Sequence, residues 1–434
     1  MKRRDFIKAG TLATGALFIP KLVHAGTKKI KLAVLGTGWW ATDYLIPAAI
    51  ASGQFEIVGL CDVDSVALNH AAELVVNLGQ DKPKLFAAYR ELYEMHGLEA
   101  VVISTPTHWH ALQFIDACKT GLHVFLEKPV SYDIMEGLAM IKAQHDAGNI
   151  VQVDFPRVMY DTNNQVKNFI QSGEAGKIYQ VKANINSPDF EMVEKEIPPT
   201  LDFENYCGPA PLTKYLCFPD KNTPNWRGIH DLSRGIMVDW GIHYIYNIRR
   251  ILDLDVPQSV QSFGGITRNF TQDNPDYLEV LYQFGNLPVQ WSHKSWDFVS
   301  PSPDRNIGVY FYGDKATVFA SDRSWQIFKP EGEKITNEIP YKKTDEDDNI
   351  ARIRNFIELF IEFSQAIHTG SASQITNTLE EAFKTTSTVI YGDISYRAEA
   401  RLEIIRDTYG IRNNEKAQSM LKREYRSPYV HPWG

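Results

Sequence analysis

Residues 29–41 read KIKLAVLGTGWWA, a short apolar strand followed directly by a G-x-G-x-x-A turn, and a helical pattern continues from there. Gly36 permits a tight turn, Gly38 lets the backbone approach a pyrophosphate, and Ala41 is small enough for close helix packing. The first turn of the helix offers unpaired N–H groups to a phosphate. This order of strand, turn and helix predicts an α/β domain of the Rossmann type that binds a dinucleotide.

The second strand of this unit indicates which dinucleotide is bound. An apolar run over residues 55–61 leads into Asp62. An acidic residue at this distance from the glycine turn can bind both ribose hydroxyls of NAD. Val63, Asp64 and Ser65 follow, so neither Arg nor Lys is offered to the 2′-phosphate of NADP. We therefore expect NAD, with NADP less favoured, although an Asp after a strand can also simply form a turn.

The composition of the 434-residue chain fits a globular protein of two domains, since the length exceeds one core of ordinary size. The formal net charge is −8 and no basic stripe stands out, which argues against nucleic-acid binding. Cys61 and Cys118 fit buried packing positions, whereas Cys207 and Cys217 can pair in an oxidising compartment, a question that sequence leaves open. Because the spacing of Cys and His is not typical of a metal site, no metal is expected.

The first 26 residues differ in character from the rest of the chain. Basic residues are followed by an apolar run over residues 9–20, which is shorter than the ~20 residues that cross a bilayer. Residues 3–8 (RRDFIK) resemble the twin-arginine export signal, and residues 23–25 (VHA) resemble a cleavage site. We expect a twin-arginine signal peptide over residues 1–26, recognition by the twin-arginine translocase and a periplasmic mature protein. An ordinary secretory leader or an N-terminal arm is the alternative.

Several motifs along the chain resemble those of the Gfo/Idh/MocA oxidoreductases (glucose–fructose oxidoreductase and inositol dehydrogenase type). They are ISTPTHWH at residues 103–110, LEKP at 126–129, SGEAGKI at 172–178, NWR at 225–227 and GIMVDWGIH at 235–243. Residues 151–157 (VQVDFPR) resemble the strand that leads into the family's second domain, although Gly is commoner at the position of Asp154. The resemblance covers about residues 30 to 425. It is specific to the superfamily rather than to one substrate.

The resemblance implies the fold of the whole chain. An α/β Rossmann domain that binds NAD is expected over residues 28–155. An α+β domain with a large, mostly antiparallel open sheet and helices on one side is expected over residues 156–434. Alternating apolar runs at 277–284, 289–295 and 308–312 agree with strands of such a sheet. The open face of this sheet often mediates assembly, so we expect a homodimer or a homotetramer.

The resemblance also implies site residues. Hydride transfer from a sugar carbon to NAD requires a base for the hydroxyl proton. Lys128 is expected to polarise and deprotonate the hydroxyl, and His243 is the alternative base, held by Asp239 four residues earlier on one helix face. The cofactor-binding residues are expected to be Gly36, Gly38, Trp39, Trp40, Asp62, Thr105, His108, His110, Glu127 and Lys128. The substrate-binding residues are expected to be Arg157, Tyr160, Trp226, Arg227 and His230, although each of these can also be structural.

Three functions fit these motifs. The leading one is an NAD-dependent oxidoreductase that acts on a hydroxyl of a sugar, glycoside or cyclitol, with a 3-keto sugar as one product. The alternative is an NAD-dependent glycoside hydrolase that oxidises C3, eliminates the aglycone from C1, adds water and reduces the ketone again. A non-catalytic binding protein is the third, and intact Lys128, Asp239 and His243 argue against it. Because NAD is made and recycled in the cytoplasm, an exported enzyme is expected to hold its NAD tightly.

Replacing Arg3 and Arg4 together by Lys should trap the precursor in the cytoplasm, because the twin-arginine route reads the arginine pair. Immunoblots of cytoplasmic and periplasmic fractions measure this, and Lys28→Gln, outside the leader, should leave export unchanged. Normal export of the doubly substituted chain would show that another route is used.

Overall fold

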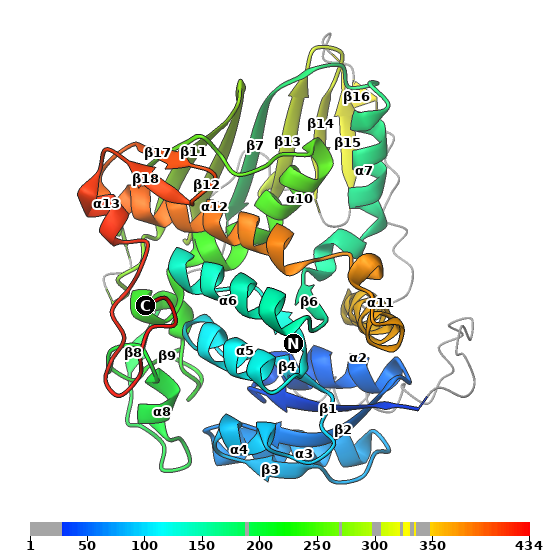
Figure 1. Ribbon diagram of the computed structural model, residues 1–434. Coiled ribbons are helices and arrows are strands. Elements are labelled where there is room, and N and C mark those ends of the chain that lie inside the picture. Colours follow the sequence, from blue (N-terminus) through cyan, green and yellow to red (C-terminus); the bar gives the residue numbers. More distant parts are fainter. Residues whose placement is uncertain are drawn as a thin grey trace.

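The computed structural model describes residues 28–186, 191–268, 271–296, 305–321, 324–329, 334–335 and 348–434. The leader expected over residues 1–26 lies outside these ranges. The described residues form a parallel α/β unit and, above it in Figure 1, an α+β unit with a larger sheet. The expected fold class is therefore confirmed. Among the described residues, no helix combines the length and the apolar character needed to cross a membrane.

The first unit is built on a parallel sheet whose six described strands have the order β3-β2-β1-β4-β5-β6, the dinucleotide-binding order. Strand residues such as Leu32 and Val102 are buried because helices cover both faces of the sheet. The strands are β1 Ile30–Leu35, β2 Phe55–Cys61, β3 Lys84–Phe86, β4 Ala100–Ile103, β5 His123–Glu127 and β6 Val151–Asp154. The helices are η1 Ala41–Leu45, α2 Ile46–Ala51, α3 Ser65–Asn77, α4 Tyr89–Tyr93, η2 Thr107–Trp109, α5 His110–Lys119 and α6 Ile134–Ala147.

Local signals set the turns around this sheet. Gly36 has φ +80°, and a Cβ there would lie 2.8 Å from the backbone of Ser104, so the turn after β1 requires glycine. The Asp64 carboxylate caps the start of α3. Asp133 and Glu136 form a capping box at the start of α6. These turns place the carboxyl ends of the strands at one edge of the sheet.

The second unit has a sheet of ten described strands in the order β16-β15-β14-β13-β7-β12-β11-β10-β17-β18, in which only the β7–β12 pair is parallel. The strands are β7 Ile178–Asn186, β10 Ser259–Gly265, β11 Tyr277–Phe284, β12 Leu287–Lys294, β13 Gly308–Gly313, β14 Thr317–Ala320, β15 Trp325–Phe328, β16 Lys334–Ile335, β17 Leu402–Ile405 and β18 Gly410–Arg412, with β8 Val193–Glu194 and β9 Leu216–Cys217 as a separate pair. The helices are η3 Pro156–Met159, α7 Asp161–Gln171, α8 Phe203–Cys207, η4 Trp226–Gly228, α9 His230–Ser233, η5 Met237–Gly241, α10 Ile242–Leu252, α11 Asp348–Thr369, η7 Ala372–Gln374, α12 Leu379–Ala398 and α13 Glu415–Ser419.

The large sheet is covered by helices on one face only. The three strands expected from the alternating runs are confirmed as β11, β12 and β13, with small shifts at their ends. Alternate residues of β11 are buried, and α12 and α10 lie against this sheet in Figure 1. The opposite face carries exposed apolar side chains, including Phe263 of β10 and Leu281 of β11.

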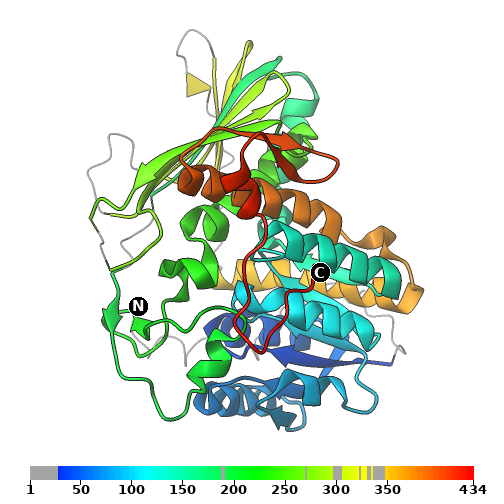
Figure 2. The same cartoon turned by 60° about the vertical axis from the view of Figure 1, so that its left-hand side comes forward.

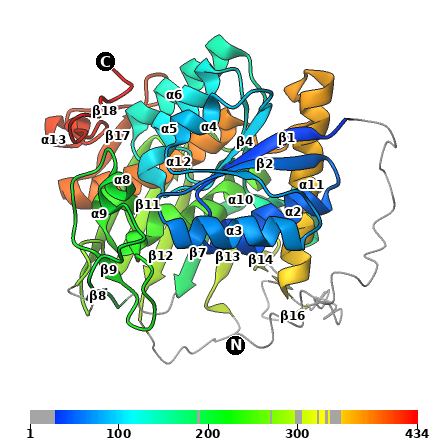
Figure 3. The same ribbon diagram turned by 90° about the horizontal axis from the view of Figure 1, so that it is seen from below.

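One helix from the second half of the chain packs on the first sheet. Phe356, Phe360 and Phe363 of α11 are completely buried there, and the Phe360 ring stacks on Phe125 with the ring centroids 4.4 Å apart. Figure 3 shows α11 beside β1, β2 and α2. A division of the chain after residue 155 therefore leaves out one helix that covers the first sheet.

The four cysteines, all within the described residues, are buried free thiols. Cys207 lies in α8 and Cys217 in β9. The structure therefore answers the open question of their pairing, since it contains no disulfide between them.

The substitution Phe360→Ala should lower the free energy of unfolding by about 3–5 kcal/mol, because it removes a buried ring and leaves a cavity between α11 and the first sheet. Urea denaturation followed by circular dichroism measures this loss. Gln365→Ala, at an exposed position of the same helix, should change stability by less than about 0.5 kcal/mol. An equally small effect of both substitutions would contradict this account of α11.

Candidate active site

The glycine turn and Asp62 lie side by side at the carboxyl ends of β1 and β2. A Cβ on Gly38 would meet no atom within 4 Å, so a phosphate can approach the backbone there. The Asp62 carboxylate accepts hydrogen bonds from the backbone N–H of Thr37 (2.6 Å) and from its hydroxyl (3.1 Å). Burial raises the pKa of Asp62, and hydrogen bonds from Asp64 and Thr37 oppose that rise. The turn and the neighbouring carboxylate thus fit the pyrophosphate and ribose of NAD.

The two tryptophans of the turn have different surroundings. Trp40 donates its indole N–H to Oε1 of Glu127, so it joins the phosphate turn to the end of β5. Trp39 stands edge-on to Trp40 with ring centroids 5.3 Å apart, and 52% of its surface is exposed. Of the two rings, Trp39 is therefore the one free to cover a bound dinucleotide.

The residues after β4 mainly hold the turns in place. The Thr105 hydroxyl donates to Oε1 of Gln113 at 2.6 Å. The ring nitrogens of His110 lie 2.8 Å from the carbonyl oxygens of Pro129 and Thr105, and burial lowers its pKa to about 4. His110 is therefore neutral and donates to one of these carbonyls at a time.

His108 is enclosed by protein in the same way. Its Nε2 lies 2.9 Å from the carbonyl oxygen of Tyr206, and burial lowers its pKa to about 3. Because almost no surface of His108 or His110 is exposed, the expected direct contact of these rings with the cofactor is not supported. They shape the loops at the strand ends.

Lys128, Asp239 and Arg227 form a buried ion-pair cluster. The Nζ of Lys128 donates to Oδ1 (2.9 Å) and to the backbone oxygen (2.7 Å) of Asp239. Arg227 donates from Nε to Oδ2 of the same carboxylate at 2.8 Å. Burial alone would raise the pKa of Asp239, but the two cations outweigh it and hold that pKa well below its usual range. The carboxylate is thus ionised at every ordinary pH.

The expected pairing of Asp239 with His243 does not form. Asp239 lies in the π-helical turn η5 and His243 in α10, and the wider i→i+5 turn removes the i, i+4 alignment of an α-helix. The Asp239 oxygens are instead occupied by Lys128 and Arg227. The Nδ1 of His243 is buried with no hydrogen-bond partner in the described part of the chain. Burial, followed by the charges of Lys128 and of two arginines, keeps the pKa of His243 well below its usual value.

The residues expected to bind substrate separate into two groups. Arg157 lies over the Trp240 ring (5.0 Å) and its charge reaches His243, so it belongs to the site. Arg227, which stacks on Trp226 at 4.4 Å, also belongs to it. His230 instead faces Oδ2 of Asp393 at 3.3 Å, in a separate network with Arg234.

Tyr160, the last of the expected substrate-binding residues, is the half-buried N-cap residue of α7. Asp154 is not among the site residues expected from the sequence. This buried carboxyl is the register partner of Glu127 on the neighbouring strand. The register alone could have indicated it, since Glu127 and Asp154 both end adjacent strands.

A segment of the second unit crosses the carboxyl ends of the first sheet. This segment, residues 193–228, is called the excursion below. Its Asp202 N–H donates to the Val63 carbonyl at 3.0 Å, directly after Asp62, and its other end carries Arg227. The C-terminal tail in turn holds the excursion, since Arg426 donates to the carbonyl oxygen of Glu204 at 2.9 Å. Figure 2 shows the tail, in red, running down beside the green excursion.

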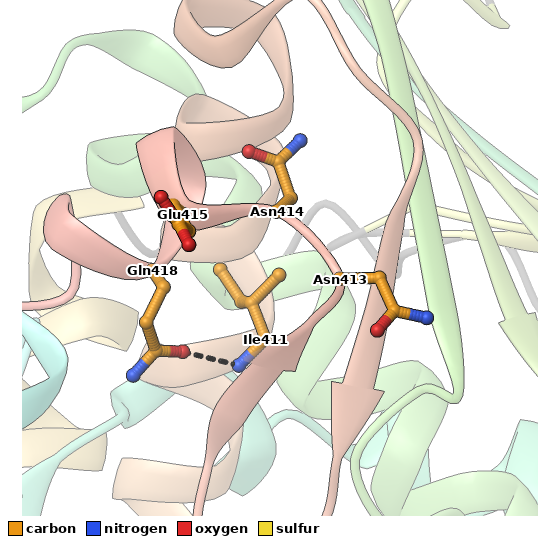
Figure 4. A pocket seen from close by; sticks show the side chains of 5 residues that line it. All are labelled: Ile411, Asn413, Asn414, Glu415 and Gln418. Carbon is orange, nitrogen blue, oxygen red and sulfur yellow. Dashed lines mark hydrogen bonds between the residues drawn. The ribbon is translucent and has the colours of Figure 1, made fainter.

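Two further features lie elsewhere. Ligand atoms of Asp133, Glu136 and His431 lie within 4.8 Å of one another, but the Arg423 guanidinium pairs with Glu136 at 2.8 Å and already supplies a cation to this cluster. The pocket in Figure 4 lies between β18, at the edge of the large sheet, and α13, where the Ile411 N–H donates to Gln418 at 2.7 Å. Neither feature includes a residue of the strand-end site.

Family models match both units of the chain. Residues 30–155 match the model described as "Oxidoreductase family, NAD-binding Rossmann fold". Residues 179–276 match "Oxidoreductase family, C-terminal alpha/beta domain". Together the two matches cover just over half of the chain.

Curated relatives match mainly in one part of the chain. A glycosyl hydrolase family 109 protein of Stenotrophomonas maltophilia is 29% identical over 155 residues, 34% of this chain and 34% of that protein. A protein of the same name from Shewanella pealeana is 29% identical over 161 residues, 31% of this chain and 35% of that protein. The chain therefore covers about a third of the length of the curated relatives that it matches.

Solved structures match over most of the chain. An oxidoreductase from Agrobacterium radiobacter in complex with NAD+, L-tartaric acid and magnesium has a TM-score of 0.66 at 16% identity, covering 87% of this chain and 98% of that one. The WlbA dehydrogenase from Chromobacterium violaceum, in complex with NADH and UDP-GlcNAcA, has a TM-score of 0.65 at 18% identity (87% and 97%). A levoglucosan dehydrogenase in complex with NADH and levoglucosan has 0.66 at 16% (87% and 99%). At these identities the likeness concerns the fold.

Proposed function

Because the chain belongs to the Gfo/Idh/MocA family of oxidoreductases, whose Rossmann domain binds NAD, we propose that it oxidises a hydroxyl group of a sugar, glycoside or cyclitol. The observation that carries this proposal is the cluster of Lys128, Asp239 and Arg227, with His243 close by, at the end of β5. Cationic donors and a neutral imidazole at the ligand-binding edge of a Rossmann sheet are suited to an alcohol substrate.

The cluster assigns different tasks to the two candidate bases. When bound, NAD accepts the hydride from the carbon that carries the hydroxyl. The Lys128 ammonium uses two of its three N–H groups on Asp239, so one remains to donate to the substrate oxygen. The His243 ring is neutral and only partly buried, so a ring nitrogen can accept the hydroxyl proton. We therefore favour His243 as the base, with Lys128 polarising the hydroxyl and Asp239 holding Lys128.

Two observations bear on the class of substrate, namely the hydrogen-bond donors of the site and the ligands of similar solved structures. Arg157 and Arg227, each stacked on a tryptophan, can donate to several hydroxyl groups at once. The similar solved structures include proteins in complex with levoglucosan and with UDP-GlcNAcA. Both observations favour a polyhydroxylated substrate.

A second candidate is a glycoside hydrolase that uses transient oxidation and elimination. It is favoured by the curated relatives, which are named glycosyl hydrolase family 109 proteins. The same site serves both reactions, because the first step of each is oxidation of a hydroxyl next to Lys128.

A panel of glycosides, incubated with the protein and an added electron acceptor, separates the two candidates. A keto sugar that accumulates only with the acceptor supports the oxidoreductase. Free sugar released without any acceptor supports the hydrolase. Turnover of neither kind across sugars, glycosides and cyclitols would contradict the proposed substrate class.

On the substrate found in this way, Lys128→Met should reduce kcat by about 10²–10⁴-fold while NAD binding is retained, because the side chain that polarises the hydroxyl is lost. Stopped-flow kinetics and the NAD content of the purified variant measure the two effects. Lys142→Met, at an exposed position of α6, is the control and should leave both unchanged. A near-wild-type rate for Lys128→Met would remove Lys128 from the mechanism.

We further propose export by the twin-arginine route to the periplasm and assembly into a homodimer or homotetramer. The leader motif supports export by this route, and the exposed Phe263 and Leu281 on the open sheet face support assembly.

An exported enzyme meets little free NAD, so we propose that NAD is bound before export and turns over in place. The excursion supports this, since it crosses the strand ends and is itself held by the tail.

Mature protein purified without added NAD should release near-stoichiometric NAD(H) on denaturation. Retention through dilution requires sub-micromolar affinity, at least about 8 kcal/mol. Arg426→Ala should lower the retained fraction by freeing the excursion, whereas Glu424→Ala, an exposed neighbour on the tail, should not. An empty protein that works only with millimolar free NAD would contradict the proposal.

A further inference from the structure

Two carboxyl groups end adjacent strands of the first sheet. Glu127 of β5 and Asp154 of β6 are partners in the parallel register, so their side chains leave the sheet on the same face. Adjacent strands lie about 4.8 Å apart, which brings the two carboxyl groups within reach of each other. Both residues are buried.

The two carboxyl groups differ in their partners. Glu127 accepts hydrogen bonds from the Trp40 indole and from the backbone N–H of Lys128 (3.2 Å). Within the described residues, neither oxygen of Asp154 accepts a hydrogen bond of ordinary geometry. A buried carboxylate without a donor costs several kcal/mol, and a second negative charge next to it adds to that cost. A proton between the two groups removes both costs.

We propose that Glu127 and Asp154 share one proton, so that Asp154 is a neutral acid that donates to Glu127 and thereby fixes the backbone of Lys128. Glu127 then carries one negative charge and has three donors: the Asp154 hydroxyl, the Trp40 indole and the Lys128 N–H. The pair links the phosphate turn to the substrate-polarising lysine. Asp154 acts through Glu127 and is therefore a positioning residue. Its role at Lys128 rests on the proposed function.

The charges around the pair agree with this state. Burial, and then the charge of Glu127, raise the pKa of Asp154, whereas the charge of Lys128 lowers it. The charge of Lys128 also acts on His110 of α5 and on His243 of α10, and His243 is in turn affected by Arg157 of η3 and Arg352 of α11. From α12, which also packs on β6, Asp393 and Glu381 are engaged by Arg234 and Arg249. Lys128, whose charge lowers the pKa of Asp154, is itself paired with Asp239.

The shared proton also predicts a pH dependence of stability, which can be measured without a substrate. The folded chain binds this proton more tightly than the unfolded chain, whose Asp has a pKa of about 3.9. The contribution of this proton to the free energy of unfolding is therefore fully present below that pH. It is lost as the pH rises toward the pKa of Asp154 in the folded chain. The Asp154→Asn variant has no such loss. The melting temperature of the variant minus that of wild type should therefore increase as the pH rises from 4 to 8.

Infrared spectroscopy reads the proton directly. The wild-type protein should show the carbonyl band of a buried carboxylic acid at pH 7, with the shift on transfer to D₂O that an acid proton requires. Asp154→Asn and Asp154→Ala should both lack this band, so that either variant serves if the other does not fold.

Asp393→Asn is the matched control. Asp393 is equally buried but pairs with Arg234 and Arg397, which hold its pKa well below the usual range against the effect of burial. This variant should keep the infrared band. It should lose stability at neutral pH, the opposite sign to Asp154→Asn, because ionised Asp393 stabilises the fold above the unfolded pKa.

The positioning role of Asp154 is tested by comparing the activities of its Ala and Asn variants. With the substrate in hand, Asp154→Ala should lower kcat/KM at least about tenfold, since a hydrogen bond to a charged group is lost, and Asp154→Asn should recover most of it through its amide N–H. Equal rates for Ala and Asn would overturn the positioning role. A missing infrared band, or a pH-independent difference in melting temperature, would overturn the shared proton. A protein that acts on no substrate but shows the band and the stability shift would contradict the proposed function alone.

Discussion

A carboxylate that is taken out of water must be paired with cations, and at Asp239 this requirement joins the two halves of the molecule. Lys128 follows the last strand residue of β5, whereas Arg227 ends the excursion and Asp239 lies in η5. Removing one partner of such a buried pair costs about 3–5 kcal/mol. The relative position of the first sheet and the α10 helix is therefore fixed at the site where substrate oxidation is proposed. Burial, and then this concentration of positive charge, keeps His243 neutral.

Much of the fold follows from local patterns in the sequence. The turn at Gly36 has one conformation that only glycine adopts easily, so strand, turn and helix can be identified without knowing any neighbour. The alternation of apolar and polar residues in β11 likewise indicates that one face of the sheet is buried and the other is open to solvent. Lys128 and Asp62 were found because both directly follow strands, and strand ends meet at one edge of a parallel sheet.

Most features that could not be predicted from the sequence depend on long-range partners. The apolar side chains of α11 indicate a buried helix but not which sheet buries it, and the Phe360 ring stacks on a residue more than 200 positions away. The pairing of Asp239 was misjudged because a local π-helical turn replaced the expected α-helix. His108 and His110 seemed available for a ligand until their carbonyl partners were located. Asp154 gains its significance only from the register of β6 against β5.

The late position of α11 also affects the order in which the molecule is made. The first sheet is complete once residue 154 has left the ribosome, but the part of one face that lies beside α2 stays uncovered until residues 348–369 emerge. Nascent chains therefore expose a broad apolar surface, including Phe55 and Phe125, through most of translation. The apolar packing beneath the first sheet is therefore completed only late in translation. A chaperone that shields this apolar surface would help the chain through the interval.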